Sequence, residues 1–387
     1  MYQLKRAWAE IDLDAVEHNY REVRRLTGDK VKIMAVVKAN AYGHGSSQVS
    51  RLLESCGADF FGVSNLMEGI SLRRAGVEKP VLILGYTPLD SVRRLYEFDL
   101  IQTLLDRDYA RLLAEAAARE GFTLNTHIKL DTGMNRIGFR DEGDGELISE
   151  VSRLCYHPNL KVSGIFTHFA AADEETPQAE AFTRAQHGRF MEVCRVLEEN
   201  AYSLDIHCCN SAATVFYPEF HHSMVRPGII LYGCSPTGKP LKEISLKPAM
   251  KLMSAVELVK TVKKGEKISY GCTFEAPRDM RVASVPIGYA DGYPRSLSNR
   301  GFAFARDKIL PIVGRICMDQ LMLDASEANV KPGDPVAFFG GDSPIEIETV
   351  AELTNTINYE IMCGVSRRVQ RVYLRGGQIC EVEDYTL

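Results

Sequence analysis

The sequence predicts an α/β protein in which a (β/α)8 barrel of the TIM type is followed by a mainly antiparallel β domain. Three observations indicate this fold class. The 387 residues suffice for two or three domains. Short apolar runs alternate with helical stretches over about the first 235 residues, and strands then follow strands directly. We therefore divide the chain into a barrel domain over residues 1–240 and a β domain over residues 241–387.

Eight runs rich in β-branched residues are expected to form the strands of the barrel. In chain order they are Val31–Val37, Phe60–Ser64, Val81–Leu84, Leu100–Leu104, Thr126–Leu130, Val162–His168, Leu204–Cys209 and Ile229–Tyr232. Between them, stretches such as Asp106–Arg119 and Gln178–Glu199 have helical spacing and good helix formers. Eight βα units of this length fit a closed barrel, and a doubly wound open sheet is the alternative.

A linker with Pro236, Gly238 and Pro240 separates the barrel from the β domain. The strands expected after it are Lys251–Val262, Lys267–Tyr270, Arg281–Ile287, Ile312–Met318 and Pro335–Phe339. One helical piece, Ile347–Thr356, interrupts them.

Composition and charge exclude several classes of protein. Hydrophobic residues make up 45% of the chain and the formal net charge is −5, which leaves no basic surplus for binding nucleic acid. The first twenty residues lack the apolar core of a signal peptide, and no apolar run is long enough to span a membrane. We expect a cytoplasmic protein that binds neither nucleic acid nor membrane.

The spacing of the cysteines and histidines also favours a cytoplasmic protein and indicates no metal site. The ten cysteines contain no CxxC pair, which is typical of reduced thiols in a cytosol. The nine histidines show no HxH or HxxxH spacing, although His221 and His222 are adjacent. We therefore expect no metal site.

Polar residues close several of the predicted barrel strands. Side chains at the carboxyl ends of barrel strands converge on one mouth, where TIM-barrel enzymes place their chemistry. Lys38 closes the first run and precedes a turn that contains Gly43 and Gly45. Such a lysine is a candidate for a desolvated amine that forms a Schiff base, and a strand-end lysine reaching solvent is the alternative.

Other strand ends add an imidazole and two guanidinium groups. Each could be explained singly, as a core histidine, a surface arginine or a helix cap. Together they suit an anionic, planar, carbonyl-bearing ligand, and pyridoxal 5'-phosphate is such a ligand. The residues are Lys129, Arg136, His168, Asn210, Ser211 and Arg226.

The segment AVVKANAYGHG at 35–45 resembles the pyridoxal-lysine signature of alanine racemases. The resemblance continues through HIKLDTGMNRIGF at 127–139, VRPGIILYG at 225–233, PIGYADGYPR at 286–295, GRICMDQ at 314–320 and INYE at 357–360. It implies a pyridoxal 5'-phosphate enzyme that works as a homodimer with shared active sites. It also implies interconversion of L- and D-alanine, which would supply D-alanine for a bacterial cell wall.

The resemblance also implies the role of each site residue. Lys38 and the partner subunit's Tyr270 would be the two catalytic acid/base groups, one on each face of the substrate. The implied cofactor-binding residues are Lys38, Tyr42, Arg136, His168, Ser211, Arg226, Gly228, Ile229 and Tyr359. The implied substrate-binding residues are Arg136, Tyr289, Met318 and Asp319, the last three reaching the partner's site from the β domain. Lys129 would be carbamylated and brace Arg136.

Some features depart from the family's pattern or leave alternatives open. Arg367 and Gln370 are off pattern, which puts the polarity of the site entrance in question. A serine or broad-specificity racemase is the alternative function, although Tyr359 favours alanine. A barrel decarboxylase would be expected to use a cysteine such as Cys317, and a non-catalytic cofactor carrier would lack the β domain.

Overall fold

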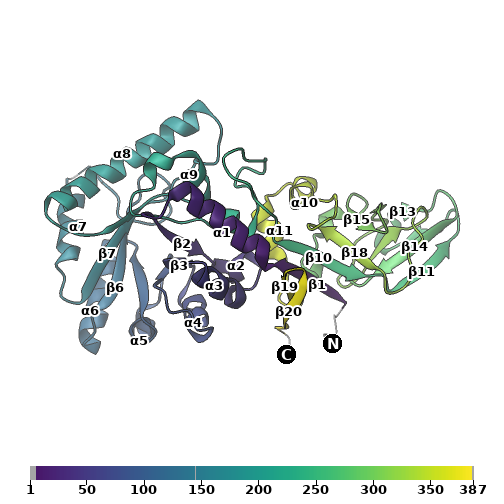
Figure 1. Cartoon of the computed structure of the whole chain (residues 1–387), viewed down its shortest axis with the longest axis horizontal. Helices are drawn as coiled ribbons and strands as arrows, with labels where there is room; N and C mark the ends of the chain where they lie inside the picture. The colour runs from purple at the N-terminus through teal and green to yellow at the C-terminus, as the bar shows by residue number, and fades with distance from the viewer. Residues whose placement is uncertain (1–5, 144, 386–387) are drawn as a thin grey trace.

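The structure, a computed structural model, describes residues 6–143 and 145–385 and contains two domains side by side along its longest axis (Figure 1). One domain is a parallel barrel surrounded by helices, and the other consists mainly of antiparallel strands. The predicted fold class is confirmed. None of the helices in the described ranges is long and apolar enough to cross a membrane.

Eight parallel strands form the barrel, in the order β8-β7-β6-β5-β4-β3-β2-β9. They are β2 (Lys32–Val36), β3 (Phe60–Val63), β4 (Val81–Ile83), β5 (Leu100–Leu104), β6 (Leu124–Lys129), β7 (Leu160–Phe166), β8 (Asp205–His207) and β9 (Met224–Val225). The backbone N–H groups of Ser223 and Arg226 donate to the carbonyls of Ile206 (3.1 Å) and Cys209 (2.9 Å). These two bonds connect the β8 and β9 segments and close the ring.

Apolar side chains fill much of the barrel, which is why its strands are rich in apolar residues. One cluster inside it takes a side chain from each of six strands: Met34, Phe60, Leu82, Ile101, Phe166 and Met224. The helices cover the outside, so both faces of each strand are buried. All five residues of β5, for example, are buried.

Several of the barrel helices begin at polar caps. The side chains of Asp12, Asn65, Asp106 and Thr176 accept backbone N–H bonds at the first turns of α1, α4, α6 and α8, and Pro177 opens α8. The α-helices are α1 (Leu13–Thr27), α2 (Lys38–Tyr42), α3 (Ser46–Ser55), α4 (Leu66–Arg74), α5 (Val92–Glu97), α6 (Arg107–Glu120), α7 (Leu147–Cys155), α8 (Pro177–Glu199) and α9 (Ser211–Phe216). Short 3-10 helices are η1 (Leu89–Ser91), η2 (Pro218–Phe220) and η3 (Ile229–Tyr232).

The last predicted barrel strand was wrong. Ile229–Tyr232 forms η3, and the eighth strand is the two-residue β9, Met224–Val225. Pro227 has no N–H to donate, and Gly228 turns the backbone away from an extended conformation (φ −124°, ψ −90°). All four residues of η3 are buried, and an apolar run buried on every side cannot be recognised as strand or helix from periodicity.

The second domain contains three sheets. The largest has the order β16-β15-β18-β10-β1-β19-β20, and the others are β11-β14-β17 and β12-β13. The strands are β1 (Ala7–Asp12), β10 (Met250–Ala255), β11 (Leu258–Val262), β12 (Lys267–Ile268), β13 (Phe274–Glu275), β14 (Met280–Val285), β15 (Phe302–Ala305), β16 (Lys308–Pro311), β17 (Leu321–Asp324), β18 (Pro335–Phe339), β19 (Gln370–Arg375) and β20 (Gln378–Glu383). Its helices are η4 (Tyr270–Cys272), η5 (Tyr289–Asp291), η6 (Arg295–Leu297), α10 (Ile347–Thr354) and α11 (Asn358–Gly364).

Two of the strands predicted for this domain were wrong in extent or place. The single run Lys251–Val262 is divided into β10 and β11, which belong to different sheets. Ile312–Met318 forms no strand and contributes only an isolated bridge from Ile312 to Leu323. Gly314 turns the backbone there with φ 81°, and the flanking segments β16 and β17 are the strands.

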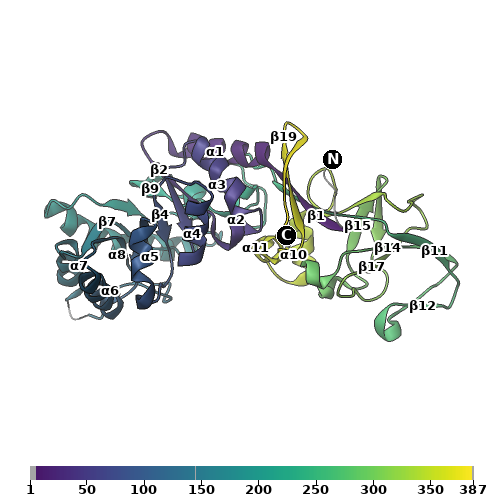
Figure 2. The same ribbon diagram turned by 90° about the horizontal axis from the view of Figure 1, so that it is seen from below.

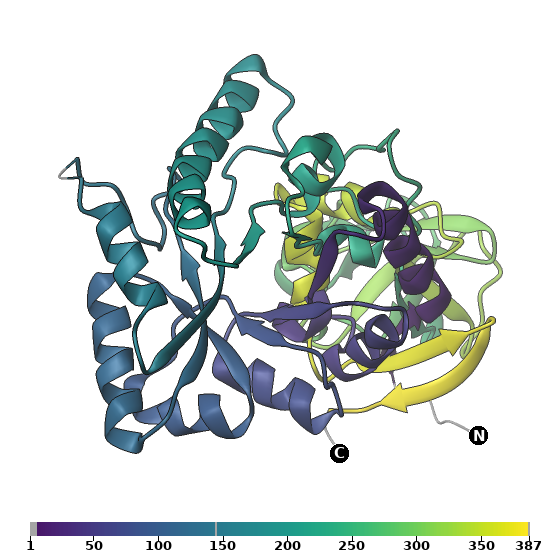
Figure 3. The ribbon, with the colours of Figure 1, turned by 60° about the vertical axis from the view of Figure 1, so that its left-hand side comes forward.

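The strand β1 belongs to the second domain although it begins the chain. It pairs with β10 antiparallel and with β19 parallel, which places it inside the seven-stranded sheet. The chain then enters the barrel through α1 and returns to the same sheet at β10. Figure 3 shows the yellow β19–β20 hairpin beside the purple N-terminal helices, where Arg375 forms an ion pair with Asp14 (3.3 Å).

Candidate active site

A pocket of about 290 Å³ lies at the carboxyl ends of the barrel strands. Most of the strand-end residues predicted from the sequence share it, and they come from segments that are far apart in the chain. The predicted residues that line it are Lys38, Tyr42, Lys129, Arg136, His168, Asn210, Ser211, Arg226, Gly228 and Tyr359.

Lys38 follows β2 at the edge of this pocket. Burial of the amine and, to a smaller extent, the positive charge of Arg136 lower the pKa of Lys38. Both effects favour the unprotonated amine, which is the nucleophilic form.

An unusual backbone turn holds Lys38 in place. The next four residues, 39–42, have φ between 52° and 56°, so the chain makes one left-handed turn. Hydrogen bonds to other segments hold the turn in place. The N–H of Ala39 donates to Glu68 Oε1 (2.9 Å), and Asn40 bonds both the N–H of Ser46 (2.9 Å) and the hydroxyl of Tyr385 (2.9 Å).

The turn also packs against α11, as Figure 2 shows by the adjacent positions of α2 and α11. A Cβ on Gly43 would lie 2.3 Å from the carbonyl oxygen of Met362, so only glycine permits this approach. The second domain therefore fixes the segment that contains Lys38.

Arg226 is a buried guanidinium at the base of the pocket. Its Nη2 donates to the carbonyls of Thr167 (2.8 Å) and Cys208 (3.1 Å) and lies 3.3 Å from His168 Nδ1. Its Nη1 lies 2.9 Å from His207 Nδ1. Burial lowers the pKa of Arg226 to about 10, so the group remains positively charged at neutral pH.

Arg226 determines how the nearby histidines are protonated. A guanidinium has no acceptor, so Nδ1 of both His168 and His207 must accept from it. His207 then carries its proton on Nε2 and donates to His127 Nδ1 across 3.0 Å. Burial, followed by the charge of Arg226, lowers the pKa of His168 and His207 well below the usual value, so both are neutral.

Lys129 is a buried amine beside two guanidinium groups. Its Nζ donates to the carbonyl of Leu130 (2.9 Å). Burial, together with the charges of Arg226 and Arg136, lowers the pKa of Lys129 to about 7. This shift favours the unprotonated amine compared with an ordinary lysine.

Hydroxyl groups and a glycine gather at another side of the pocket. Ser211 Oγ accepts from the N–H of Gly228 (2.8 Å). A Cβ on Gly228 would lie 2.4 Å from the hydroxyl oxygen of Tyr42, so this close approach of Tyr42 is possible only because residue 228 is glycine. The ring of Tyr359 lies 6.0 Å from that of Tyr42. Ile229 follows Gly228 and is fully buried.

Sequence reasoning missed several lining residues. Asp173 follows the predicted strand end at His168, and Cys363 lies one helical turn after Tyr359 on α11. The remaining missed residues are apolar or small: Val36, Ala39, Leu84, Ile137, Phe166, Ala212 and Pro236. The acidic residue that ends FTHFAAAD at 166–173 and the four-residue spacing on α11 were the available signals.

Apart from Tyr359, the predicted residues of the β domain do not line this pocket. Tyr270, Tyr289 and Met318 are exposed by 70%, 42% and 53%. Tyr270 begins η4, directly after β12, and Figure 2 places β12 at the end of the second domain away from the barrel. Asp319 accepts from Arg368 Nη2 (2.5 Å).

The two residues that depart from the family's pattern contact the C-terminal segment. Gln370 donates to Asp384 (3.1 Å), and the guanidinium of Arg367 lies over the ring of Tyr385 at 5.7 Å. Tyr385 in turn bonds Asn40 in the left-handed turn. These contacts connect the departures to the segment that holds Lys38.

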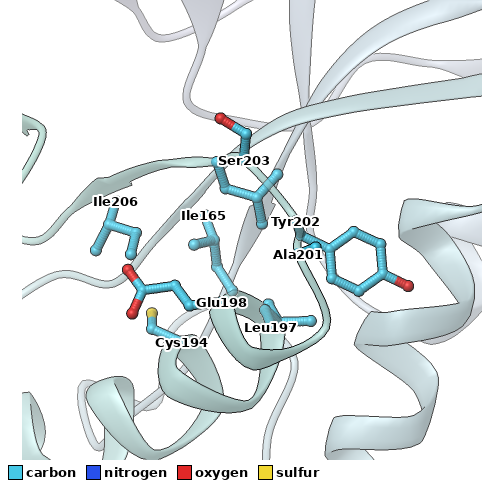
Figure 4. Close-up of a pocket in the computed structure, with 9 residues that line it drawn as sticks. Ile165, Cys194, Leu197, Glu198, Ala201, Tyr202, Ser203 and Ile206 are labelled. Carbon is cyan, nitrogen blue, oxygen red and sulfur yellow. The ribbon is translucent and has the colours of Figure 1, made fainter.

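A further cavity, of about 350 Å³, lies between the C-terminal part of α8 and strands β7 and β8 (Figure 4). Its lining includes Cys194, Leu197 and Ile206, with Glu198 as its charged group. It lacks the converging amine, guanidinium and imidazole groups of the strand-end pocket, which is therefore the candidate active site.

Known proteins match both domains. The family model described as "Alanine racemase, N-terminal domain" matches residues 11–236, and "Alanine racemase, C-terminal domain" matches residues 249–373. An alanine racemase from Desulforamulus reducens is 45% identical over 370 residues, which cover 95% of this chain and 98% of the relative. One from Clostridium tetani is 40% identical over 388 residues and covers 99% of both.

Solved structures agree with the sequence relatives. The alanine racemase of Clostridium difficile 630 has a TM-score of 0.95 at 36% identity and covers 100% of both chains. The enzyme of Bacillus anthracis with bound L-Ala-P has a TM-score of 0.92 at 35% identity, over 100% of this chain and 99% of that one.

Proposed function

The chain belongs to the alanine racemase family and is a pyridoxal 5'-phosphate-dependent enzyme that interconverts L- and D-alanine, and we propose from this premise which of its residues carry out the reaction. The observation that supports the proposal best is the meeting of Lys38, Arg226 and Gly228 in one strand-end pocket. When bound, the cofactor supplies an electron sink that makes the α-proton of the amino acid acidic.

The chemistry of the pocket suits this cofactor. Lys38 offers an amine whose unprotonated form is favoured, as covalent attachment of an aldehyde requires. Ser211, Tyr42 and Tyr359 offer hydroxyl groups in the pocket, and the absence of a Cβ on Gly228 lets the Tyr42 hydroxyl lie against the backbone there. We propose that these hydroxyls and the backbone N–H groups of Gly228 and Ile229 hold the phosphate.

Arg226 is proposed to donate to the pyridine nitrogen. Its Nη1 and Nη2 bond protein groups, and its Nε has no hydrogen bond to another residue of the described ranges. Nε–H is therefore the free donor. A guanidinium that keeps its proton leaves the ring nitrogen unprotonated, which moderates the electron sink and disfavours side reactions. His168, neutral and bonded to Arg226, would contact the ring or its hydrogen-bond network.

Lys129 is proposed to carry a carbamate. Its pKa of about 7 leaves an amine that can react with CO2 at neutral pH. The product is an anion, which would attract the guanidinium of Arg136 instead of repelling it. Arg136 would then be held beside the cofactor and the substrate carboxylate.

Racemisation requires acid/base groups on both faces of the substrate, because the proton leaves one face and returns to the other. Lys38 is proposed for one face. Tyr270 cannot serve the same chain's pocket, since it lies at the far end of the second domain (Figure 2). We therefore propose a homodimer in which the partner subunit's Tyr270 serves the other face, with Tyr289, Met318 and Asp319 near the substrate across the interface. The exposure of Tyr270, Tyr289 and Met318 supports this interface.

The proposed setting is a bacterial cytoplasm in which the enzyme supplies D-alanine for the cell wall. The ten cysteines form no disulfide, which agrees with a reducing compartment.

Alanine is the proposed preferred substrate, and serine the alternative. We expect Tyr359 to crowd the extra hydroxyl of serine, which lowers kcat/KM by roughly 10- to 200-fold, the usual range for such a difference in a tight site. The test incubates the purified holoenzyme with L-alanine or L-serine and measures the D-isomer with a D-amino-acid oxidase. Equal kcat/KM values would support a broad-specificity racemase instead.

A further inference from the structure

Three side chains that can bind a metal ion meet on the outside of the barrel wall. They are His187 on α8, Cys208 directly after β8 and His222 shortly after η2. Their ligand atoms all lie within 4.8 Å of one another. Cys208 is buried, and both histidines are half-buried, so solvent can reach the cluster from the histidine side.

The fold separates this cluster from the active-site pocket. His207 points into the barrel, where it contacts Arg226, and successive side chains of an extended segment point to opposite faces. Cys208 therefore points outward, toward α8. Its backbone carbonyl still accepts from Arg226 (3.1 Å), so the cluster lies directly behind that residue.

The two imidazoles face each other through their Nε2 atoms. These atoms are 2.8 Å apart, the ring planes differ by 9°, and the centroids are 5.1 Å apart. This is the geometry of an N–H···N hydrogen bond, in which both nitrogens are directed at one hydrogen. The ring of Phe220 stacks on His187 at 3.7 Å and fixes its orientation. The two nitrogens are thus already directed at one point, which an ion can occupy in place of the hydrogen.

The third donor lies close enough to complete a site. A tetrahedral Zn²⁺ with bonds of about 2.0–2.3 Å holds its ligand atoms about 3.3–3.8 Å apart. The nitrogens would separate by about half an ångström, and the sulfur would approach by about one ångström at most. The imidazoles, whose Nε2 atoms now oppose each other along one line, would also tilt until the N–metal–N angle approaches the tetrahedral value. Cys208 Sγ lies 3.3 Å from the carbonyl oxygen of Phe220, and binding would replace this contact.

One thiolate and two imidazoles form a donor set that selects zinc-like cations over Mg²⁺ or Ca²⁺, which require oxygen ligands. We propose that His187, Cys208 and His222 bind a thiophilic divalent cation of the zinc class, with water as the fourth ligand. On binding, the thiol releases its proton to solvent as the S–metal bond forms. The imidazole whose Nε2 carries the shared hydrogen loses it and takes a proton from solvent on Nδ1, so that both neutral rings donate an Nε2 lone pair to the metal.

Cobalt titration tests this site in the untagged holoenzyme after treatment with a chelator. Cobalt(II) is a spectroscopic substitute for zinc, and thiolate ligation gives a charge-transfer band in the near ultraviolet. We expect one Co²⁺ per chain, a band that Zn²⁺ abolishes, and loss of the band in Cys208→Ser. His187→Gln and His222→Gln should each weaken binding more than the roughly 10- to 100-fold that loss of an outer-shell partner costs.

His221→Gln is the matched control, because His221 is the adjacent histidine and its Nε2 contacts the carbonyl of Thr214 (2.9 Å) instead of the cluster. It should bind Co²⁺ as the unmodified chain does. Absence of binding, a band that survives Cys208→Ser, or equal affinity in His222→Gln and His221→Gln would each overturn the site. Circular dichroism and cofactor absorbance check folding. Racemase activity of His187→Gln is measured in metal-free buffer as well. This measurement tests the proposed function independently of whether the cluster binds metal.

Discussion

At the scale of single residues, predictability depended on position along a strand. Lys38, His168 and Arg226 were predicted because polar residues that close parallel strands must meet at one mouth, and all three line the pocket. Asp173 and Cys363 were not, since one follows in a loop and the other comes from a helix of the second domain. The spacing of residues along the sequence does not show that residues from a loop or from the second domain will line the same pocket.

Removal of the proposed attachment point tests the site most directly. Lys38→Ala should abolish racemisation and the visible absorbance of the bound cofactor, since Lys129, the other lysine that lines the pocket, lies at the end of β6 and is proposed to carry a carbamate. Absorbance spectra and a D-alanine assay check this. Lys32→Ala, which alters an exposed lysine of β2 paired with Asp205 (2.7 Å), should retain both signals. Full absorbance in Lys38→Ala would refute the assignment.

The lowered pKa of Lys129 predicts how its modification depends on pH. Below the pKa of about 7 the ammonium form dominates and cannot attack CO2, whereas above it the free amine dominates. Carbamylation should therefore increase as pH rises through about 7. Carbon-13 NMR with labelled bicarbonate should show a carbamate signal that follows this profile. The same signal in Lys129→Ala would show that another lysine is responsible.

At the scale of elements, the sequence predicted strands well where turns or helices bounded them. The predicted segments Leu100–Leu104 and Pro335–Phe339 match β5 and β18. Prediction failed where a short buried 3-10 helix had the composition of a strand, as in η3. It also failed where an apolar run bent between two sheets, as in β10 and β11. Packing against distant segments decides whether such runs form a strand or a helix. A local sequence pattern contains no information about that packing.

The left-handed turn after Lys38 gives a prediction at this scale. A left-handed conformation costs non-glycine residues roughly 1–2 kcal/mol each, and a β-branched residue suffers most. Ala39, with φ 52°, should tolerate glycine with little change in stability. Ala39→Val should lower the urea midpoint of the holoenzyme measurably. A valine variant as stable as the glycine variant would mean that the turn rearranges in solution.

At the scale of the whole molecule, the two domains place the proposed acid/base groups far apart within one chain. The segment α2, which begins at Lys38, lies where the domains meet, and β12, shortly before Tyr270, lies at the opposite end of the second domain (Figure 2). An arrangement that looks incomplete in one subunit becomes complete in a two-fold dimer. Each subunit then lends its β domain to the other's pocket.

Subunit mixing tests this arrangement. Lys38→Ala and Tyr270→Phe should each be nearly inactive as homodimers, because both sites lack the same group. A mixed dimer collects both defects in one site and leaves the other intact. Random exchange makes about half the dimers mixed, so activity should recover to roughly a quarter of the unmodified level. No recovery after verified exchange would mean that one chain supplies both groups to its own site.

The position of β1 has a consequence for how the protein folds during translation. The neighbours of β1 in the sheet, β10 and β19, are translated long after it, since the whole barrel lies between β1 and β10. The barrel can fold before β10 and β19 have been translated. Until then, the backbone N–H and C=O groups of β1 remain unpaired. In a fragment of residues 241–387, β1 would be missing and the sheet would have a gap between β10 and β19. The second domain therefore cannot complete its sheet without β1, the strand that is translated first.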